Sequence, residues 1–163
     1  MVLSEGELLA AAASQRAAGR TIAFANGVFD LLHVGHVRYL RAAAGEADRL
    51  VVAVNDDPIA ARKGPGRPIL AAADRAELVA ALRVVDYVVI FADETVARLL
   101  TLLKPDVHCK GTDYTVDTVP ERDVVLGYGG RIAIVGDPKR HNTRDLLARL
   151  RQRQSRDDSA GRH

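Results

Sequence analysis

His33 and His36 stand close together in the chain, with Gly35 directly before the second histidine. An imidazole can donate a hydrogen bond to an anionic oxygen, and a glycine lets an anion approach the backbone because no Cβ is in the way. The pattern therefore favours binding of a phosphate. The two histidines could instead share a metal with Asp30, but no cysteine or second carboxylate completes a familiar zinc spacing. A further alternative, which the short motif alone leaves open, is that one imidazole is a hydrogen-bonded core group.

The surroundings of the two histidines strengthen the phosphate interpretation. Residues 21–25 are mostly apolar and favour a strand, whereas residues 35–45 have apolar positions at helical spacing. His33 and His36 therefore lie at a junction between a strand and a helix. In an open parallel sheet such junctions meet at the carboxyl edge, where ligands bind and where a helix start offers unpaired N–H groups to a phosphate.

The rest of the chain alternates between strand and helix patterns. Residues 49–55 form a continuous apolar run, which is typical of a strand covered on both faces. Ser4 and Glu7 have the spacing of a capping box at the start of an N-terminal helix. Further strands are predicted over residues 86–91, 106–110 and 131–135, and further helices over residues 4–19, 74–82, 93–104, 122–128 and from 140 onward, where Asn142 is a candidate N-cap. This alternation predicts an α/β fold, a Rossmann-like doubly wound parallel sheet of five strands in a single domain.

A long connection, residues 56–71, follows the second predicted strand. It contains Lys63-Gly-Pro-Gly-Arg-Pro68, in which two prolines and two glycines disfavour regular structure and two cations are expected to be exposed. Loops of this length in compact domains usually have a function, although a solvated turn would have the same composition. Because the loop follows the carboxyl end of a strand, we interpret it as facing phosphate.

Composition sets limits on the class of protein. A chain of 163 residues with 48% apolar residues suits one core, which we assign to residues 1–150, and residues 151–163 are expected to form a disordered polar tail. A formal net charge of +2 gives no case for a nucleic-acid surface. The single cysteine, Cys109, fits a reducing compartment, and no segment is long and apolar enough for a signal peptide or membrane span. We therefore expect a cytoplasmic protein that binds neither nucleic acid nor membrane.

The segment from Gly27 to His36 reads Gly-Val-Phe-Asp-Leu-Leu-His-Val-Gly-His. It resembles the signature of the cytidylyltransferase-like nucleotidyltransferases, which transfer a nucleoside monophosphate from a nucleoside triphosphate to a phosphorylated acceptor. The resemblance runs from the first helix to Leu150. Within this superfamily the chain looks most like the adenylyltransferases that act on D-glycero-D-manno-heptose 1-phosphate and make ADP-heptose. This closer likeness is carried by residues 17–20, 52–56, 63–68, 102–107 and 110–114.

The resemblance implies an enzyme that transfers AMP from ATP to a sugar 1-phosphate, with Mg²⁺ bridging phosphate oxygens and without a metal site made of protein side chains. It also implies a homodimer. By the same resemblance, the catalytic residues are His33, His36 and Lys63, and the acceptor-binding candidates are Arg67 and Arg75. The nucleotide-binding candidates are Asn26, Gly27, Val28, Phe29, Asp30, Gly35, Asn55, Lys110, Gly111, Asp113, Asn142 and Thr143. His108 and Cys109, inside a predicted strand, are expected to be core groups.

One segment departs from the family pattern. Related enzymes place a Ser-Thr-Thr-like run at the start of the last helix, whereas this chain has Asn142-Thr143-Arg144. This change is the only support for a regulatory nucleotide-binding module without catalysis, and the presence of both histidines argues against that function. The main alternative is a cytidylyltransferase for glycerol 3-phosphate or another polyol phosphate.

Overall fold

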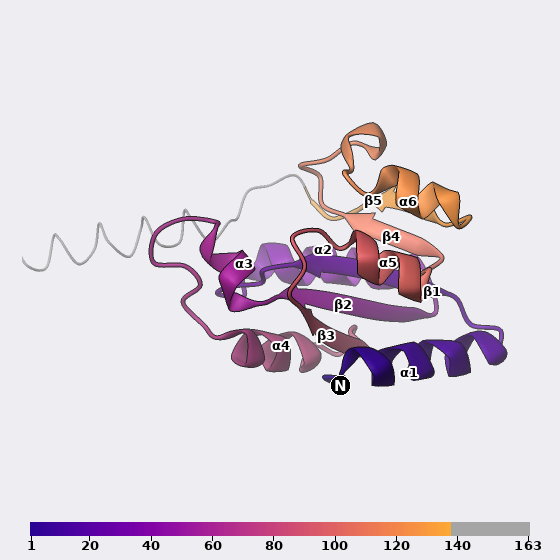
Figure 1. The fold of residues 1–163 in the computed structure, drawn as a ribbon, viewed down its shortest axis with the longest axis horizontal. Coiled ribbons are helices and arrows are strands. Elements are labelled where there is room, and N and C mark those ends of the chain that lie inside the picture. Colours follow the sequence, from indigo (N-terminus) through magenta and orange to yellow (C-terminus); the bar gives the residue numbers. More distant parts are fainter. Residues whose placement is uncertain (138–163) are drawn as a thin grey trace, which may run out of the picture.

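Five parallel strands form one sheet with the order β3-β2-β1-β4-β5 in this computed structural model, which describes residues 1–137. The strands are β1 (Ile22–Gly27), β2 (Arg49–Asn55), β3 (Tyr87–Phe91), β4 (Val107–Lys110) and β5 (Arg131–Ile134) (Figure 1). From β1 the chain adds β2 and β3 on one side and later β4 and β5 on the other. The strand order therefore reverses beside β1, and such a switch point opens a crevice at the carboxyl edge. The predicted doubly wound five-stranded sheet is confirmed.

Helices cover both faces of the sheet. They are α1 (Glu5–Ala17), α2 (Val34–Ala44), α3 (Asp57–Ala61), α4 (Ala72–Ala80), α5 (Ala97–Leu103) and α6 (Arg122–Gly127), with a short 3₁₀ helix, η1 (Val116–Thr118). Residues of α2 and α4 pack in one apolar cluster with the strands, whereas residues of α1, α5 and α6 pack in a second cluster. In Figure 1, α2 lies behind the sheet and α5 in front of it.

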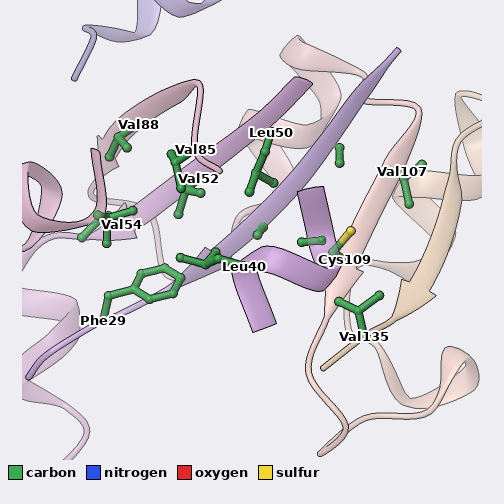
Figure 2. Packing of buried hydrophobic residues seen from close by; sticks show 14 of the residues in the cluster. Phe29, Leu40, Leu50, Val52, Val54, Val85, Val88, Val107, Cys109 and Val135 are labelled. Atoms are coloured by element: carbon green, nitrogen blue, oxygen red, sulfur yellow. The ribbon is translucent and has the colours of Figure 1, made fainter. Parts of the chain in front are cut away.

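Strand β2 shows why the central strands have continuous apolar sequences. Successive side chains of a strand point to opposite faces. Val52 and Val54 accordingly belong to the cluster on the α2 and α4 side, and Val51 and Ala53 to the cluster on the other side. Figure 2 shows the first of these clusters, with Leu40 of α2 among the strand side chains. Both faces of β2 are buried, as the apolar run predicted.

The N-terminal helix begins as predicted. The Ser4 side chain accepts a hydrogen bond from the backbone N–H of Glu7, and the Glu7 carboxylate accepts one from the backbone N–H of Ser4. This capping box satisfies two backbone donors that the first helical turn leaves unpaired. The predicted last helix and polar tail lie outside the described residues. Within residues 1–137, no helix has the length and apolar character needed to span a membrane.

The sequence suggested that residues 56–71 form a loop throughout, but the structure has a short helix in this connection. This helix is α3, which starts where the Asp56 side chain accepts a hydrogen bond from the backbone N–H of Ile59 at 3.1 Å. Pro58 lies in the first turn, where its missing N–H would have had no helical partner. A helix of five residues is too short to show a periodic apolar pattern, but this cap and proline were a usable signal. The irregular part of the connection, including Lys63 to Pro68, is confirmed as loop.

Candidate active site

A cavity of about 410 Å³ opens at the carboxyl edge of the sheet. Its walls come from the ends of β1, β2, β4 and β5, from the start of α2 and from Lys63 of the long connection. It is lined by residues 26–29, 33, 35, 36, 38, 39, 55, 63, 110–114 and 135–137. The cavity therefore occupies the crevice that the reversal of strand order produces, next to β1.

Most of the site residues chosen from the sequence meet in this cavity. Those that line it are Asn26, Gly27, Val28, Phe29, His33, Gly35, His36, Asn55, Lys63, Lys110, Gly111 and Asp113. Asp30, Arg67 and Arg75 are not among its lining residues. Asn142 and Thr143 lie outside the part of the chain that the structure describes.

His33 is the N-cap of α2. Its Nδ1 accepts a hydrogen bond of 3.1 Å from the backbone N–H of Gly35. A ring nitrogen that accepts a hydrogen bond carries no proton, so the neutral ring of His33 has its proton on Nε2. The helix start thereby sets this imidazole as a donor through Nε2.

His36 lies in the first turn of α2, beside His33. The two rings are stacked, with 3.9 Å between their centroids and 23° between their planes. Both side chains are partly exposed and line the cavity, so neither is the enclosed core group considered above. Two imidazoles and the N-terminus of α2 thus share one wall, an arrangement that suits an anion.

Phe29 packs against the histidine wall of the cavity. Its ring meets that of His36 edge to face, with 5.4 Å between the centroids. A Cβ added to Gly27 would come within 3.2 Å of the Phe29 ring, which explains why glycine suits the end of β1. Phe29 and Leu31 both have positive φ angles, 51° and 52°. Two strained residues on either side of Asp30 indicate that this turn is held in place by its surroundings.

Asp30 connects the histidine turn to the long connection. Its buried carboxylate accepts hydrogen bonds from the backbone N–H groups of Ile69 and Leu70 at 3.1 and 3.2 Å, and it pairs with Arg67 Nε at 2.6 Å. Asp30 therefore orients the turn, one of the roles considered from the sequence. Arg67 is engaged in this pair, so the structure does not support its predicted contact with an acceptor.

Arg75 has a different position from the one predicted. The side chain is fully buried and donates hydrogen bonds to the backbone oxygens of Leu70 at 2.9 Å and Val28 at 2.5 Å. It also forms an ion pair of 2.7 Å with Asp57 of α3. Arg75 thus joins three segments and is not among the residues that line the cavity, so the structure lends no support to a contact with an acceptor. The sequence could not show this, because Val28 and Asp57 are distant in the chain and reach Arg75 only when the chain folds.

Two lysines, Lys63 and Lys110, line the cavity from distant parts of the chain. Lys110 ends β4 and is mostly buried, and its Nζ donates a 3.1 Å hydrogen bond to Asn26 Oδ1. Burial lowers the pKa of Lys110, and the positive charge of Lys63 lowers it further, whereas Glu121 opposes the change. The mutual repulsion of Lys63 and Lys110 would be relieved by an anion bound between them. The charges therefore point to the same ligand class as the histidines.

His108 lies next to this cation and is a core group, as predicted. It is fully buried, and its Nε2 is 3.3 Å from Asn26 Oδ1. Burial, with a contribution from the Lys110 charge, lowers the pKa of His108 to about 3. The ring is therefore neutral at physiological pH. The neighbouring thiol of Cys109 is also buried, and burial raises its pKa to about 12.

The buried ring predicts a pH-dependent stability. An exposed histidine in the unfolded chain takes up a proton near pH 6.5, whereas folded His108 does so only near pH 3, so acid favours the unfolded state between these values. Lowering the pH from 7 to 5 should cost about 2 kcal/mol of unfolding free energy through this residue. In urea titrations, His108→Gln should lose less stability over this interval than the wild type. Equal losses in the two proteins would contradict this prediction.

Several cavity residues were not chosen from the sequence. They are Arg38, Tyr39, Thr112, Tyr114, Val135, Gly136 and Asp137. Tyr39 donates a 2.8 Å hydrogen bond to the backbone oxygen of Cys109, which joins α2 to β4. At the rim, Arg38 pairs with Asp137 at 2.9 Å. Arg38 and Tyr39 follow His36 within one turn of the same helix, and this was the only signal in the sequence for their position.

Known proteins share this sequence and architecture. The chain is 46% identical to the bifunctional protein HldE of Ectopseudomonas mendocina over 153 residues, and 44% identical to that of Pseudomonas fluorescens strain SBW25 over 151 residues. These alignments cover 93% and 92% of this chain but 32% of each relative, so the chain spans about a third of their length.

Solved structures agree with this likeness. The lipopolysaccharide core biosynthesis protein of Thermoplasma volcanium is 29% identical, with a TM-score of 0.63 over 74% of this chain and 100% of that one. Pantothenate synthetase of Thermus thermophilus is 21% identical, with a TM-score of 0.59 over 82% of this chain and 60% of that one, and shares the fold. The cytidylyltransferase-like family model matches residues 24–148, which include the histidine turn and the described cavity walls. The chain therefore belongs to the cytidylyltransferase-like family.

Proposed function

We propose that this chain is a nucleotidyltransferase that transfers AMP from ATP to a heptose 1-phosphate, giving ADP-heptose and pyrophosphate. The observation that carries the transfer activity is the meeting of His33, His36, Lys63 and Lys110 in one cavity at the start of α2. Membership of the cytidylyltransferase-like family supports the reaction class. The likeness to a lipopolysaccharide core biosynthesis protein supports a sugar phosphate as the acceptor.

The reaction joins two anions. A phosphate oxygen of the acceptor attacks the α-phosphorus of ATP, the bond from that phosphorus to the bridging oxygen of the β-phosphate breaks, and pyrophosphate leaves with the electron pair. No nucleophilic side chain takes part in this direct displacement. The catalyst must align the reactants and offset the charge that grows in the transition state.

The cavity residues have chemistry suited to these tasks. His33 is set as an Nε2 donor, which would stabilise charge on the α-phosphate, with His36 beside it. Lys63 and Lys110 would neutralise phosphate charge from the other walls. The N-terminal end of α2, which carries the positive end of the helix dipole, would favour an anion at the same wall. Asn55, Gly111 and Asp113 complete the walls available to the base and ribose.

Mg²⁺ is proposed as part of the ATP complex. Residues 1–137 contain no group of three or more histidine, cysteine, aspartate or glutamate side chains arranged to hold a metal ion. Oxygen atoms of the triphosphate are ligands that Mg²⁺ prefers. When Mg²⁺ is bound to such a substrate, it usually has few ligands from the protein. When bound, it would neutralise phosphate charge.

The homodimer implied by the family resemblance also stays a prediction, which light scattering at assay concentration would test.

A pyrophosphate-release screen tests the proposed donor and acceptor. ATP, CTP, GTP and UTP would each be supplied with Mg²⁺ and one of three acceptors: heptose 1-phosphate, glucose 1-phosphate or glycerol 3-phosphate. We expect ATP with heptose 1-phosphate to give the highest kcat/KM. Faster turnover of CTP with glycerol 3-phosphate would instead assign the chain to the cytidylyltransferases of polyol phosphates. Absence of pyrophosphate release with every pair would contradict catalysis itself.

A further inference from the structure

We propose that Glu121 is a positioning residue of the nucleotide site, which acts by holding the Lys110 ammonium against the cavity. Neither the sequence motifs nor the cavity lining includes Glu121. The inference rests on the proposed function, because it assumes that a nucleoside triphosphate occupies this cavity. It assigns a purpose to a buried acid in the segment between β4 and α6.

The contact between the two residues is enclosed. Lys110 Nζ lies 3.2 Å from Glu121 Oε2, and the side chains are only 8% and 7% exposed. The same Nζ donates to Asn26 Oδ1 at 3.1 Å and lies over the Tyr114 ring, 5.3 Å from its centroid. An ammonium has three N–H donors. One of them is directed to Asn26, and the Glu121 carboxylate holds the ammonium at ion-pair distance, in a residue that lines the cavity.

Glu121 does not serve its own helix. It occupies the N-cap position of α6, where a side chain would normally accept a hydrogen bond from the first turn. No such bond forms, and the carboxylate extends to β4 instead. The pair thus spans two segments that the chain brings together only on folding. A buried ion pair of this kind adds little net stability, because removing both charges from water costs about as much as their attraction returns. A role in positioning explains the pair better than stability alone.

The charges around Lys110 show what Glu121 opposes. Lys63 approaches from the long connection as a like charge, and His108 on β4 is neutral. Tyr114 contributes a ring face and Asn26 an amide oxygen. Glu121 is the negative charge that raises the Lys110 pKa, against burial and Lys63. Without it, the ammonium would lose its proton more readily and would keep only the Asn26 hydrogen bond and the Tyr114 ring to hold it at the cavity.

The test is a double-mutant cycle on nucleotide affinity. Calorimetry at pH 7.5 with Mg²⁺ would measure the Kd of ATP, and of CTP, for the wild type, Glu121→Gln, Lys110→Met and the double variant. We expect Glu121→Gln to weaken binding about tenfold, within the range for one interaction with a charged group, and to have little further effect in the Lys110→Met background. Asp123→Asn is the matched control, because Asp123 lies on the same helix with a 95% exposed side chain.

A second measurement does not depend on nucleotide binding. In lysine-labelled protein, the NMR titration of Lys110 should move to lower pH in Glu121→Gln, because the substitution removes the charge that raises the Lys110 pKa. As the pH is raised, nucleotide affinity should therefore begin to fall at a lower pH in this variant than in the wild type. The Asp123→Asn variant should match the wild type in both measurements.

The possible failures can be told apart. Unchanged affinity in Glu121→Gln, an equal loss in the Lys110→Met background, or an unchanged Lys110 titration would each overturn the role of Glu121 and leave the proposed function intact. If the wild type bound neither ATP nor CTP, the proposed function would fail together with this inference. Thermal unfolding of each variant would show whether a loss of binding reflects a loss of fold.

Discussion

Replacing His36 by alanine should lower turnover about 100- to 1,000-fold, the effect of removing one donor aimed at developing charge. The stacked imidazole contributes to the wall that would receive the α-phosphate, and a methyl group cannot donate in its place. Steady-state pyrophosphate release would measure kcat and KM. We expect most of the loss in kcat, because the donor matters most when charge accumulates in the transition state.

His33 requires a different substitution, because it also caps α2. His33→Ala would remove the cap and the donor together, and losing a cap costs about 1 kcal/mol of stability. Asparagine is a favoured N-cap residue, so His33→Asn should retain the helix start while losing the Nε2 donor. A melting temperature close to that of the wild type with a similar 100- to 1,000-fold loss of turnover would assign the donor to catalysis. Near-wild-type turnover of both His33→Asn and His36→Ala would remove the proposed mechanism.

Replacing Lys63 by alanine should reduce turnover by about 10- to 100-fold, as expected for one charge-assisted contact with phosphate. Its ammonium faces the cavity and acts on Lys110 through space. Gly64 and Gly66 follow it with φ angles of 140° and 71°, values that side chains rarely adopt. Arg62→Ala is the matched control, because Arg62 is exposed and pairs with Glu94 outside the cavity. Its turnover should stay close to that of the wild type.

The same loop should respond to the nucleotide. Cleavage by trypsin after Arg62 or Lys63 should be slower with ATP and Mg²⁺ than without them, because an anion between the two lysines would hold the loop in place. The pair of Asp30 with Arg67 anchors the other end of the loop, which leaves Lys63 as its cation facing the cavity. Normal activity of Lys63→Ala, or cleavage that nucleotide does not slow, would return this segment to the alternative of a solvated turn.

The sequence was sufficient for the fold and for the edge of the sheet at which most of the candidate residues meet. Apolar runs predicted the five strands, and the Ser4 capping box marked the first helix, because both depend on interactions within a few residues. The histidines could be placed at the carboxyl edge for a similar reason. A strand followed by a helix start determines which edge of a parallel sheet the junction occupies, whatever the rest of the chain does. The cavity accordingly contains twelve of the predicted site residues.

The structure decided which polar groups line the cavity and which pair with other parts of the chain. Arg75 and Arg67 carry the positive charge expected of phosphate-binding residues, yet their guanidinium groups pair with Asp57 and Asp30. Glu121 had no motif to mark it, yet it reaches Lys110. These partners are separated along the chain by loops, and the charge of a side chain does not reveal which opposite charge it will meet. A buried guanidinium or carboxylate needs a partner within hydrogen-bonding distance, because an unpaired buried charge is costly. Only the folded chain determines which groups lie near enough to be that partner.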